Sequence, residues 1–314
     1  MKLSRRLPIL IGSIVLFTCA AIIIAVQIAV TNKMEASAFR ELSAEARINS
    51  DLISTKIYSD LIQLREIANE ESMRTMDWDT VRENLIPDIK RINAGDLALV
   101  YPDGTTYSVS VSTGSVGNMG DRDYVKAAFS GQMVVSDVLL DRLTNTPSLM
   151  LAVPVFQNDE PNAPVIGVVF ARKDAYSTLD GMVNSIQFQT ESGYAFMVNK
   201  EGVILAHPNQ TLVNSMYNPI VEASNDPSYQ SLADMLKEVI TKNIGIGTYT
   251  YMNESKICAF SEVKGHNGWK LIATIERIDF EREIKQTVMI ILLIGIISFL
   301  VSIGISILVG RIIA

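Results

Sequence analysis

The sequence predicts an α+β fold in which two similar modules of short strands and helices stand in tandem on a long N-terminal helix, with one membrane-spanning helix on either side of them. Three observations lead to this prediction. An uncharged apolar run lies near each end of the 314-residue chain, an amphipathic stretch without proline or glycine follows the first run, and two similar successions of strands and turns come next. With 48% hydrophobic and 19% charged residues, the chain is too apolar for a disordered protein.

The two uncharged runs predict the membrane helices. Residues 7–30 hold no charged side chain over 24 positions, and residues 287–310 repeat this pattern. At 1.5 Å per residue, a helix of about 20 residues crosses the roughly 30 Å of hydrocarbon in a bilayer. We therefore expect both runs to span the cell membrane, which makes the chain a multi-pass protein.

Basic residues at the two ends predict the orientation. They precede the first run and follow the second, so residues 1–6 and 311–314 are predicted to be cytoplasmic and residues 31–286 extracytoplasmic. These basic residues are Lys2, Arg5, Arg6 and Arg311. With 23 basic and 34 acidic side chains, the outer segment has a net charge of −11, which argues against nucleic acid or anionic lipid as its partner.

A cleaved signal peptide is the alternative for the first run. Ala36-Ser37-Ala38 resembles the small-residue pattern of a cleavage site. The apolar run is longer than the roughly 7 to 15 residues of the apolar region in a signal peptide, and the site lies beyond the charged residues Lys33 and Glu35. An uncleaved membrane anchor is therefore favoured.

The sequence offers little for a disulfide, a metal or a reaction. Cys19 lies in the first apolar run and Cys258 is alone in the outer segment, so no disulfide is expected there, which favours a bacterial source. His207 and His266 lack cysteine or acidic residues at the spacing of a zinc site. Motifs of nucleophilic, metallopeptidase and phosphate-binding sites are absent from the sequence. We expect no metal, no cofactor and no enzymatic activity.

Residues 33–70 predict one long amphipathic helix. Apolar side chains recur at three- and four-residue steps, with one double step, and polar residues fill the gaps. The apolar residues are Phe39, Leu42, Ala46, Ile53, Ile57, Leu61, Leu64 and Ile67. At 1.5 Å per residue the helix reaches on the order of 50 Å from the membrane. Its stripe from Leu42 to Leu64 either forms the seam of a dimer or is covered by the chain's own modules.

The rest of the outer segment contains two modules of similar order, at residues 84–180 and 184–276. In the first, the turn Pro102-Asp103-Gly104 joins two strands into a hairpin, and a helix and three strands follow. These elements are expected at 97–101, 105–111, 121–129, 133–135, 148–155 and 165–170. The second module repeats the order, with a hairpin from Tyr194, a helix at 227–240 and strands at 245–252, 256–263 and 269–275. If the long helix runs outward, the first module is the farther from the membrane.

This arrangement resembles the double Cache (dCache_1) sensor domain of bacterial methyl-accepting chemotaxis proteins, which has two PAS-like modules. The most specific match runs from Asp121 to Phe170, as DRDYVKAAFSGQMVVSDVLLDRLTNTPSLMLAVPVF and then VIGVVF. It is similar to the family's pattern of Arg-x-aromatic, an alanine-rich helical turn, a glycine, and strands ending in Pro-Val and Gly-Val-Val. Gly310 to Ala314 are similar to the opening of a HAMP signalling module, so we expect this chain to stop where the cytoplasmic part begins.

The resemblance implies that the membrane-distal module holds a ligand. Arg122 matches the arginine that binds a ligand carboxylate in this family, and Asp141 matches an expected aspartate. Tyr124 stands where the family's amino-acid sensors have tryptophan, and Arg172 stands where they have the acidic residue that binds an ammonium group. Two further expected tyrosines are replaced by Val125 and Leu139. The amino-acid motif is therefore broken, and an amino acid is the third choice of ligand.

Side-chain chemistry ranks the other ligands. Two guanidinium groups, from Arg122 and Arg172, suit a carboxylate through charge-assisted hydrogen bonds, so an organic acid is expected first. A neutral ring stacked on Tyr124, as in a purine or pyrimidine, is expected second. The remaining candidates for ligand contacts are Tyr101 on the first hairpin and Ser136, Asp137 and Asp141 near the following strands.

The sequence thus predicts the extracytoplasmic small-molecule sensing region of a transmembrane chemoreceptor. It is expected to pass ligand binding through the second membrane helix to a cytoplasmic signalling module, with chemotaxis as the first choice of output. The alternatives are the input region of a sensor histidine kinase or diguanylate cyclase, and a membrane-anchored adhesive surface protein. The resemblance also implies a parallel homodimer along the long helix.

Overall fold

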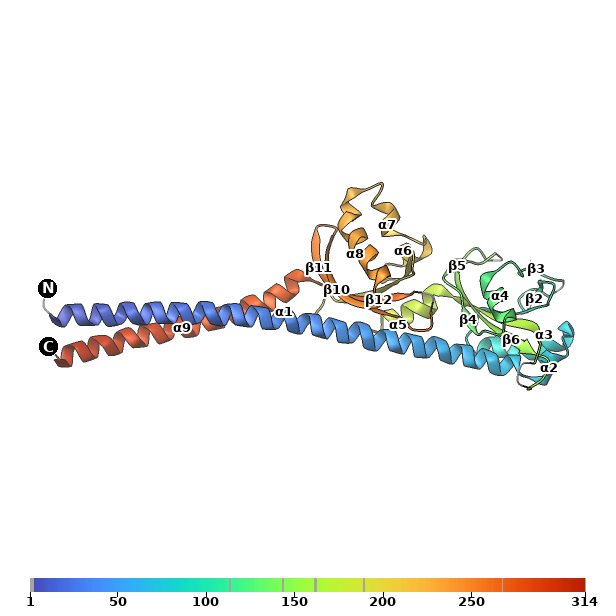
Figure 1. Cartoon of the computed structure of the whole chain (residues 1–314), viewed down its shortest axis with the longest axis horizontal. Helices are drawn as coiled ribbons and strands as arrows, with labels where there is room; N and C mark the ends of the chain where they lie inside the picture. Colours follow the sequence, from blue (N-terminus) through green and yellow to red (C-terminus); the bar gives the residue numbers. More distant parts are fainter. Residues whose placement is uncertain are drawn as a thin grey trace.

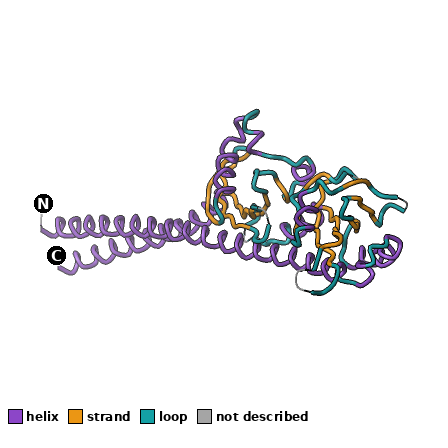
Figure 2. The backbone as a smooth tube through the Cα atoms, turned by 45° about the vertical axis from the view of Figure 1, so that its right-hand side comes forward, coloured by secondary structure: helices purple, strands orange, loops and turns teal. Residues whose placement is uncertain are grey.

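The computed structural model describes residues 3–112, 114–142, 144–160, 163–188, 190–266 and 268–313. The molecule is elongated: helix α1 (Leu3–Ala68) runs along its length, and two sheets lie one after the other on one side of the helix (Figure 1). The two termini lie at the same end, where α9 (Arg277–Ile313) runs beside α1 (Figure 2). The far sheet and the two termini therefore lie at opposite ends of the molecule.

Helix α1 joins the first predicted membrane run to the predicted amphipathic helix without a break. It has 66 residues, so at 1.5 Å per residue it is about 100 Å long. Both α1 and α9 are long and apolar enough to cross a membrane. Where they project beyond the sheets, their apolar side chains are open to the surroundings, as at Phe17, which is 76% exposed. Such exposure suits contact with lipid.

The distal sheet, at the end of α1 away from the termini, has seven strands (Figure 1). Its order is β3-β2-β1-β7-β6-β4, with β5 paired to β6. The strands are β1 (Asp96–Val100), β2 (Thr105–Ser108), β3 (Gly117–Asn118), β4 (Val134–Val135), β5 (Leu139–Leu140), β6 (Pro147–Phe156) and β7 (Val165–Asp174). Helix α4 (Asp123–Phe129) packs on the sheet face opposite α1. The predicted hairpin, short helix and three strands of the first module are all present.

Two helices that the sequence patterns did not predict turn the chain at the far end of α1. They are α2 (Glu71–Arg74) and α3 (Trp78–Arg91). Asp77 caps α3, because its Oδ2 accepts hydrogen bonds from the amide nitrogen of Thr80 at 3.2 Å and from the Thr80 hydroxyl at 2.6 Å. These helices close the end of the core beneath the distal sheet.

The proximal sheet has five strands in the order β10-β11-β12-β8-β9. They are β8 (Tyr194–Val198), β9 (Ile204–Ala206), β10 (Ile244–Tyr251), β11 (Glu254–Glu262) and β12 (Lys270–Glu276). The sheet is preceded by the short helices η1 (Tyr176–Asp180) and α5 (Gly181–Val183). Its face opposite α1 carries α6 (Gln210–Asn214), α7 (Pro219–Glu222), η2 (Pro227–Tyr229) and α8 (Gln230–Thr241). The predicted helix at 227–240 thus divides into η2 and α8.

The two modules share one plan. The strand order β2-β1-β7-β6-β4 of the distal sheet corresponds to β9-β8-β12-β11-β10 of the proximal sheet. In each module α1 covers one face of the sheet and shorter helices cover the other (Figure 1). The predicted α+β fold class, with two tandem modules of the PAS-like kind on a long helix, is confirmed.

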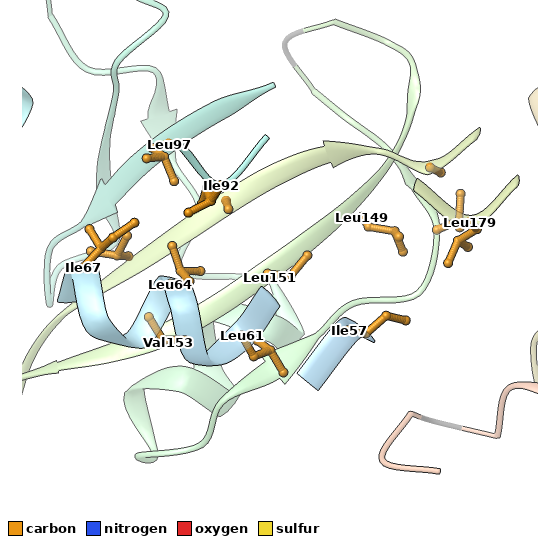
Figure 3. Close-up of a cluster of buried hydrophobic side chains, with 14 of the residues drawn as sticks. Ile57, Leu61, Leu64, Ile67, Ile92, Leu97, Leu149, Leu151, Val153 and Leu179 are labelled. Atoms are coloured by element: carbon orange, nitrogen blue, oxygen red, sulfur yellow. The ribbon is translucent and has the colours of Figure 1, made fainter. Parts of the chain in front are cut away.

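The apolar stripe of α1 is buried against the chain's own sheets. Leu42 and Ala46 pack on β11 and β12, and the stripe residues from Ile53 to Ile67 belong to the main core. Figure 3 shows Leu61 and Leu64 directed toward Leu151 and its neighbours on the distal sheet. The dimer seam considered for Leu42 to Leu64 is therefore wrong, because intramolecular burial removes these side chains from the surface.

Candidate functional site

A small pocket lies in the distal module, on the sheet face that carries α4. Its volume is about 10 Å³, enough for one water molecule. It is lined by Asp96, Ser108, Val116, Met119, Arg122, Tyr124, Leu139, Asp141, Arg142, Met150, Phe170 and Arg172. We call this the distal pocket. It brings together four of the predicted site residues, which are Arg122, Tyr124, Asp141 and Arg172.

Arg122 is positioned by the start of α4, where it is the N-cap residue. Its amide donates to the carbonyl oxygen of Met119 at 3.0 Å, and its own carbonyl accepts from the amides of Val125 at 3.1 Å and Lys126 at 3.0 Å. These bonds fix the backbone. The Nε of the side chain is buried and has no hydrogen-bond partner among the described residues. A buried cationic donor without a partner is costly, so this group favours an anionic acceptor.

Tyr124 lies one residue into α4 and forms part of the pocket wall. Its ring meets that of Phe170 edge to face, with centroids 5.8 Å apart and planes at 73°. Burial raises the pKa of its phenol to about 12. The nearby positive charge of Arg122 lowers this pKa, but by less than burial raises it. Tyr124 therefore stays a neutral hydroxyl at physiological pH and can donate a hydrogen bond to a ligand.

Arg172 and Asp141 face each other across the pocket. The Arg172 Nε lies 3.4 Å from Asp141 Oδ2, and Arg172 Nη2 donates to the carbonyl oxygen of Gly95 at 3.2 Å. Asp141 also accepts a hydrogen bond from the Thr144 hydroxyl at 2.9 Å. Asp141 thus offsets the charge of Arg172, while Arg172 is only 16% exposed and remains on the pocket wall.

Asp96 is a buried acidic residue of the pocket that the sequence patterns did not identify. It lies on β1 directly opposite Arg172 in the register of β1 and β7. Its carboxylate accepts hydrogen bonds from the hydroxyls of Ser108 and Ser110 and from the amides of Leu97 and Ser110. With these four donors, Asp96 needs no ligand to satisfy its charge.

Arg142 stands at the mouth of the pocket. Its Nη2 lies 2.7 Å from Asp121 Oδ2, and the hydrogen bond from Arg142 lowers the pKa of the Asp121 carboxyl. Both side chains are about half exposed. The pair joins the segment before α4 to the segment after β5, and so links two walls of the pocket.

The structure places the other three candidate residues outside the distal pocket. Tyr101 follows β1 on the face that packs toward the main core, and its hydroxyl donates to the carbonyl oxygen of Met76 at 2.8 Å. Successive side chains of a strand point to opposite faces, which puts Asp96 and Tyr101 on opposite sides. Ser136 and Asp137 line a neighbouring cleft instead.

The neighbouring cleft, which we call the intermodule cleft, has a volume of about 540 Å³. It shares Arg122, Tyr124 and Leu139 with the distal pocket and includes Lys200 of the proximal module. Ser136 is engaged there, since its hydroxyl accepts from the amide of Met150 at 3.0 Å. Asp137 accepts a hydrogen bond from Trp269 of the proximal module, and burial raises the pKa of its carboxyl. The cleft adjoins the pocket at the three shared residues.

The residues missed from sequence come from alternate positions on strands. Ser108, Met150 and Phe170 reach the pocket from β2, β6 and β7, so only the strand order and register bring them together. The alternation of each strand predicts two faces, but it does not say which face lies under α4. Among the described residues, no group of three His, Cys, Asp or Glu side chains is placed to hold a metal.

Comparison with known proteins agrees with this architecture. The family model of the Cache domain, dCache_1, matches residues 30–284. No curated protein sequence matches the chain. Solved structures with the same fold include the ligand-binding domain of the Pseudomonas aeruginosa PAO1 amino acid chemoreceptor PctB in complex with L-Arg. That structure is 19% identical with a TM-score of 0.59, and the match covers 78% of this chain and 97% of that one.

Two further chemoreceptor ligand-binding domains show the same likeness. That of Pseudomonas fluorescens CtaA, in complex with L-isoleucine, is 17% identical with a TM-score of 0.61, covering 80% of this chain and 98% of that one. That of Campylobacter jejuni Tlp3, in complex with 4-methylisoleucine, is 14% identical with a TM-score of 0.58, covering 79% and 94%. At these identities the likeness concerns the fold. Since the family model spans both sheets and the helix that backs them, this chain belongs to the Cache-domain family.

Proposed function

We propose that this chain is the small-molecule sensing region of a transmembrane chemoreceptor. The observation that carries the proposal is the buried Arg122 Nε, which has no hydrogen-bond partner in the described part of the chain and lies where the distal pocket adjoins the larger intermodule cleft. The Cache-domain family and the chemoreceptor ligand-binding domains of the same fold support it.

The charges of the pocket favour a carboxylate ligand. Its lining contains three arginines and two aspartates. Asp96 is satisfied by serine hydroxyls and amides, Asp141 is paired with Arg172, and Arg142 is paired with Asp121. Arg122 is left as the cation whose charge no carboxylate in the pocket offsets. A small organic acid is therefore our first choice, held by charge-assisted hydrogen bonds from Arg122.

An amino acid, ranked third from the sequence alone, is our second choice. PctB and CtaA were solved with L-Arg and L-isoleucine, and a ligand carboxylate on Arg122 would leave Asp141 within the same pocket. At 3.4 Å, the Arg172 contact with Asp141 is longer than an ordinary charged hydrogen bond, so an ammonium group can compete for that carboxylate. A purine or pyrimidine on Tyr124 ranks third, because Phe170 already packs against this ring.

We further propose that α1 and α9 span the cell membrane, with residues 31–286 outside and both ends in the cytoplasm. The uncharged runs and their basic flanks support this topology. Ligand binding would shift α9 relative to α1 and so reach a cytoplasmic module. Chemotaxis is the first choice of output, ahead of a histidine kinase or diguanylate cyclase; adhesion at the cell surface is the competing function.

A parallel homodimer also belongs to this proposal, with a seam different from the buried stripe. On the side of α1 opposite that stripe, Ile48 and Leu52 are 55% and 60% exposed, and Tyr58 is 58% exposed. Two copies anchored in one membrane would hold these residues at the same height. Apolar side chains one turn apart on a helix surface suit pairing with an identical helix.

The test is a binding screen on the full chain in lipid nanodiscs. Thermal unfolding is followed with organic acids, amino acids, purines and pyrimidines, because a ligand of the native state raises the melting temperature. Arg122→Ala should weaken the binding of a carboxylate by about 2–5 kcal/mol, roughly 30-fold or more in Kd. The matched control is Lys126→Ala on the same helix, whose ammonium is 61% exposed.

The outcomes separate the candidates. A carboxylate that binds the wild type and the Lys126→Ala chain but not Arg122→Ala supports the sensing function and the role of Arg122. A ligand whose affinity is unchanged by Arg122→Ala places the site elsewhere. No melting shift with any class would favour the adhesive function.

A further inference from the structure

One side-chain hydrogen bond links the distal and proximal modules directly. The indole Nε1 of Trp269 donates to Oδ1 of Asp137. Trp269 is 1% exposed, and its ring stacks on His266 with centroids 4.9 Å apart. Because the indole ring is enclosed, it has little freedom to rotate. A movement of Asp137 must therefore move the backbone of Trp269 or break the hydrogen bond.

On the distal side, Asp137 belongs to the short segment 134–142 that forms one wall of the pocket. Leu139, two residues later, lines both the pocket and the intermodule cleft, and Asp141 lies in the pocket. Val138, between Asp137 and Leu139, is buried in the main core, and the Ser136 hydroxyl accepts a hydrogen bond from the amide of Met150. Leu139 and Asp141 are close to Asp137 along the chain, so a change in the pocket that shifts either residue also shifts Asp137.

On the proximal side, Trp269 immediately precedes β12, which is paired with β11 on one side and β8 on the other. The carbonyl oxygen of Trp269 accepts from the amide of Val263 at 2.9 Å. β12 ends at Glu276 and α9 begins at Arg277, so no loop separates them. A strand paired on both edges moves as a unit, and its displacement reaches the helix that follows.

We propose that the Asp137–Trp269 hydrogen bond couples the pocket wall 134–142 to α9. Asp137 is then a positioning residue for Leu139 and Asp141, and the proximal module completes the distal site through Trp269. This inference deepens the proposed sensing function and rests on it. Coupling between two sites is reciprocal, so a change at either end of the bond biases the other.

The contact between α1 and α9 near the termini offers a readout that needs no ligand. A Cβ on Gly295 would lie 2.4 Å from Cδ1 of Ile23, so cysteines at these two positions are close enough for a disulfide. Ile23→Cys and Gly295→Cys are introduced together into a full chain in which Cys19→Ser and Cys258→Ala remove the native thiols. The rate of disulfide formation in nanodiscs reports the relative position of the helices.

Breaking the bond in the distal module should change this rate. Asp137→Ala is expected to alter it by about fivefold or more, the lower range of coupling between sites. Asp137→Asn keeps an acceptor for the indole and should stay near the parent rate. Asp159→Ala, which removes an exposed ion pair of the distal module with Arg74, is the matched control and should have no effect.

The reverse direction is read by amide hydrogen exchange. Trp269→Phe removes the donor and keeps an aromatic ring, and it should speed exchange in residues 134–142 about fivefold or more. Lys264→Ala breaks the 3.0 Å ion pair with Asp51 of α1 and should leave that segment unchanged. An unchanged disulfide rate in Asp137→Ala, or unchanged exchange in Trp269→Phe, would overturn the coupling. Neither readout uses a ligand, so a failed ligand screen and a failed coupling remain distinguishable.

Discussion

At the level of residues, neighbouring cations on β7 serve opposite faces of the distal sheet. Arg172 lies on the pocket side, whereas Lys173 points to α1, where its Nζ is 2.7 Å from Asp60 Oδ2. Both members of that ion pair are only 7% exposed. The sequence indicated a pocket role for Arg172 but no partner for Lys173, because charge alone does not reveal a partner far away in the chain. The partner comes from a helix more than one hundred residues earlier.

Removing one member of this buried pair should destabilise the protein. Lys173→Met leaves Asp60 with the more exposed Lys56 at 3.5 Å and is expected to cost about 3 kcal/mol, the low end for an uncompensated buried charge. Combining it with Asp60→Leu should restore much of the loss. Thermal unfolding in detergent measures both. Lys237→Ala, which breaks an exposed pair, should cost about 1 kcal/mol or less; a double variant no more stable than Lys173→Met would contradict the assignment.

At the level of elements, the periodicity of α1 was sufficient to predict a helix but not what covers it. The step pattern identified all the buried apolar residues from Leu42 to Ile67, with Phe39 partly buried, but not the buried Ser50 and Asp60. Whether another chain or the chain's own sheets covered them depended on β11 and β12. Small residues on those strands, Ala259 and Ala273, let α1 approach closely at Ala46. Close packing of this kind is sensitive to added volume.

Enlarging Ala46 should therefore force α1 away from the proximal sheet. Ala46→Leu is expected to cost about 1–3 kcal/mol, since added methylenes in a packed core displace their neighbours. This corresponds to a melting temperature lower by about 2–4 °C per kcal/mol. Ala36→Leu makes the same substitution at an exposed position of α1 and should stay within about 0.5 kcal/mol of the parent. Equal effects at both positions would show that the contact with β11 and β12 is not the cause.

At the level of the whole molecule, the two modules share one continuous core and one backing helix. The main core contains Leu151 of the distal sheet together with Met197 and Trp269 of the proximal module. The terminal ends of α1 and α9 lie at the opposite end of the molecule from the distal sheet (Figure 1). A dimer that used the free side of α1 would leave both pockets and this shared core undisturbed.

Single cysteines test that dimer. In a chain without native thiols, Ile48→Cys and Leu52→Cys should give disulfide-linked dimers in membranes, because a parallel pair brings each position opposite its own copy. Arg47→Cys is the control, since Arg47 is exposed but is turned about 100° around α1 from Ile48 and about 140° from Leu52. Crosslinks at Arg47 equal to those at Ile48 would indicate random collision, and no crosslink at Ile48 or Leu52 would rule out this seam.

The sequence by itself determined the two apolar runs, the long helix and the order of strands in both modules. These depend on local composition and periodicity, which neighbouring residues carry. Tertiary structure alone decided that Asp96 lies opposite Arg172 in the sheet, that Tyr101 faces the core, and that Asp137 accepts a hydrogen bond from Trp269. These depend on strand register and on contacts between distant segments, and a one-residue difference in register would turn each side chain to the other face.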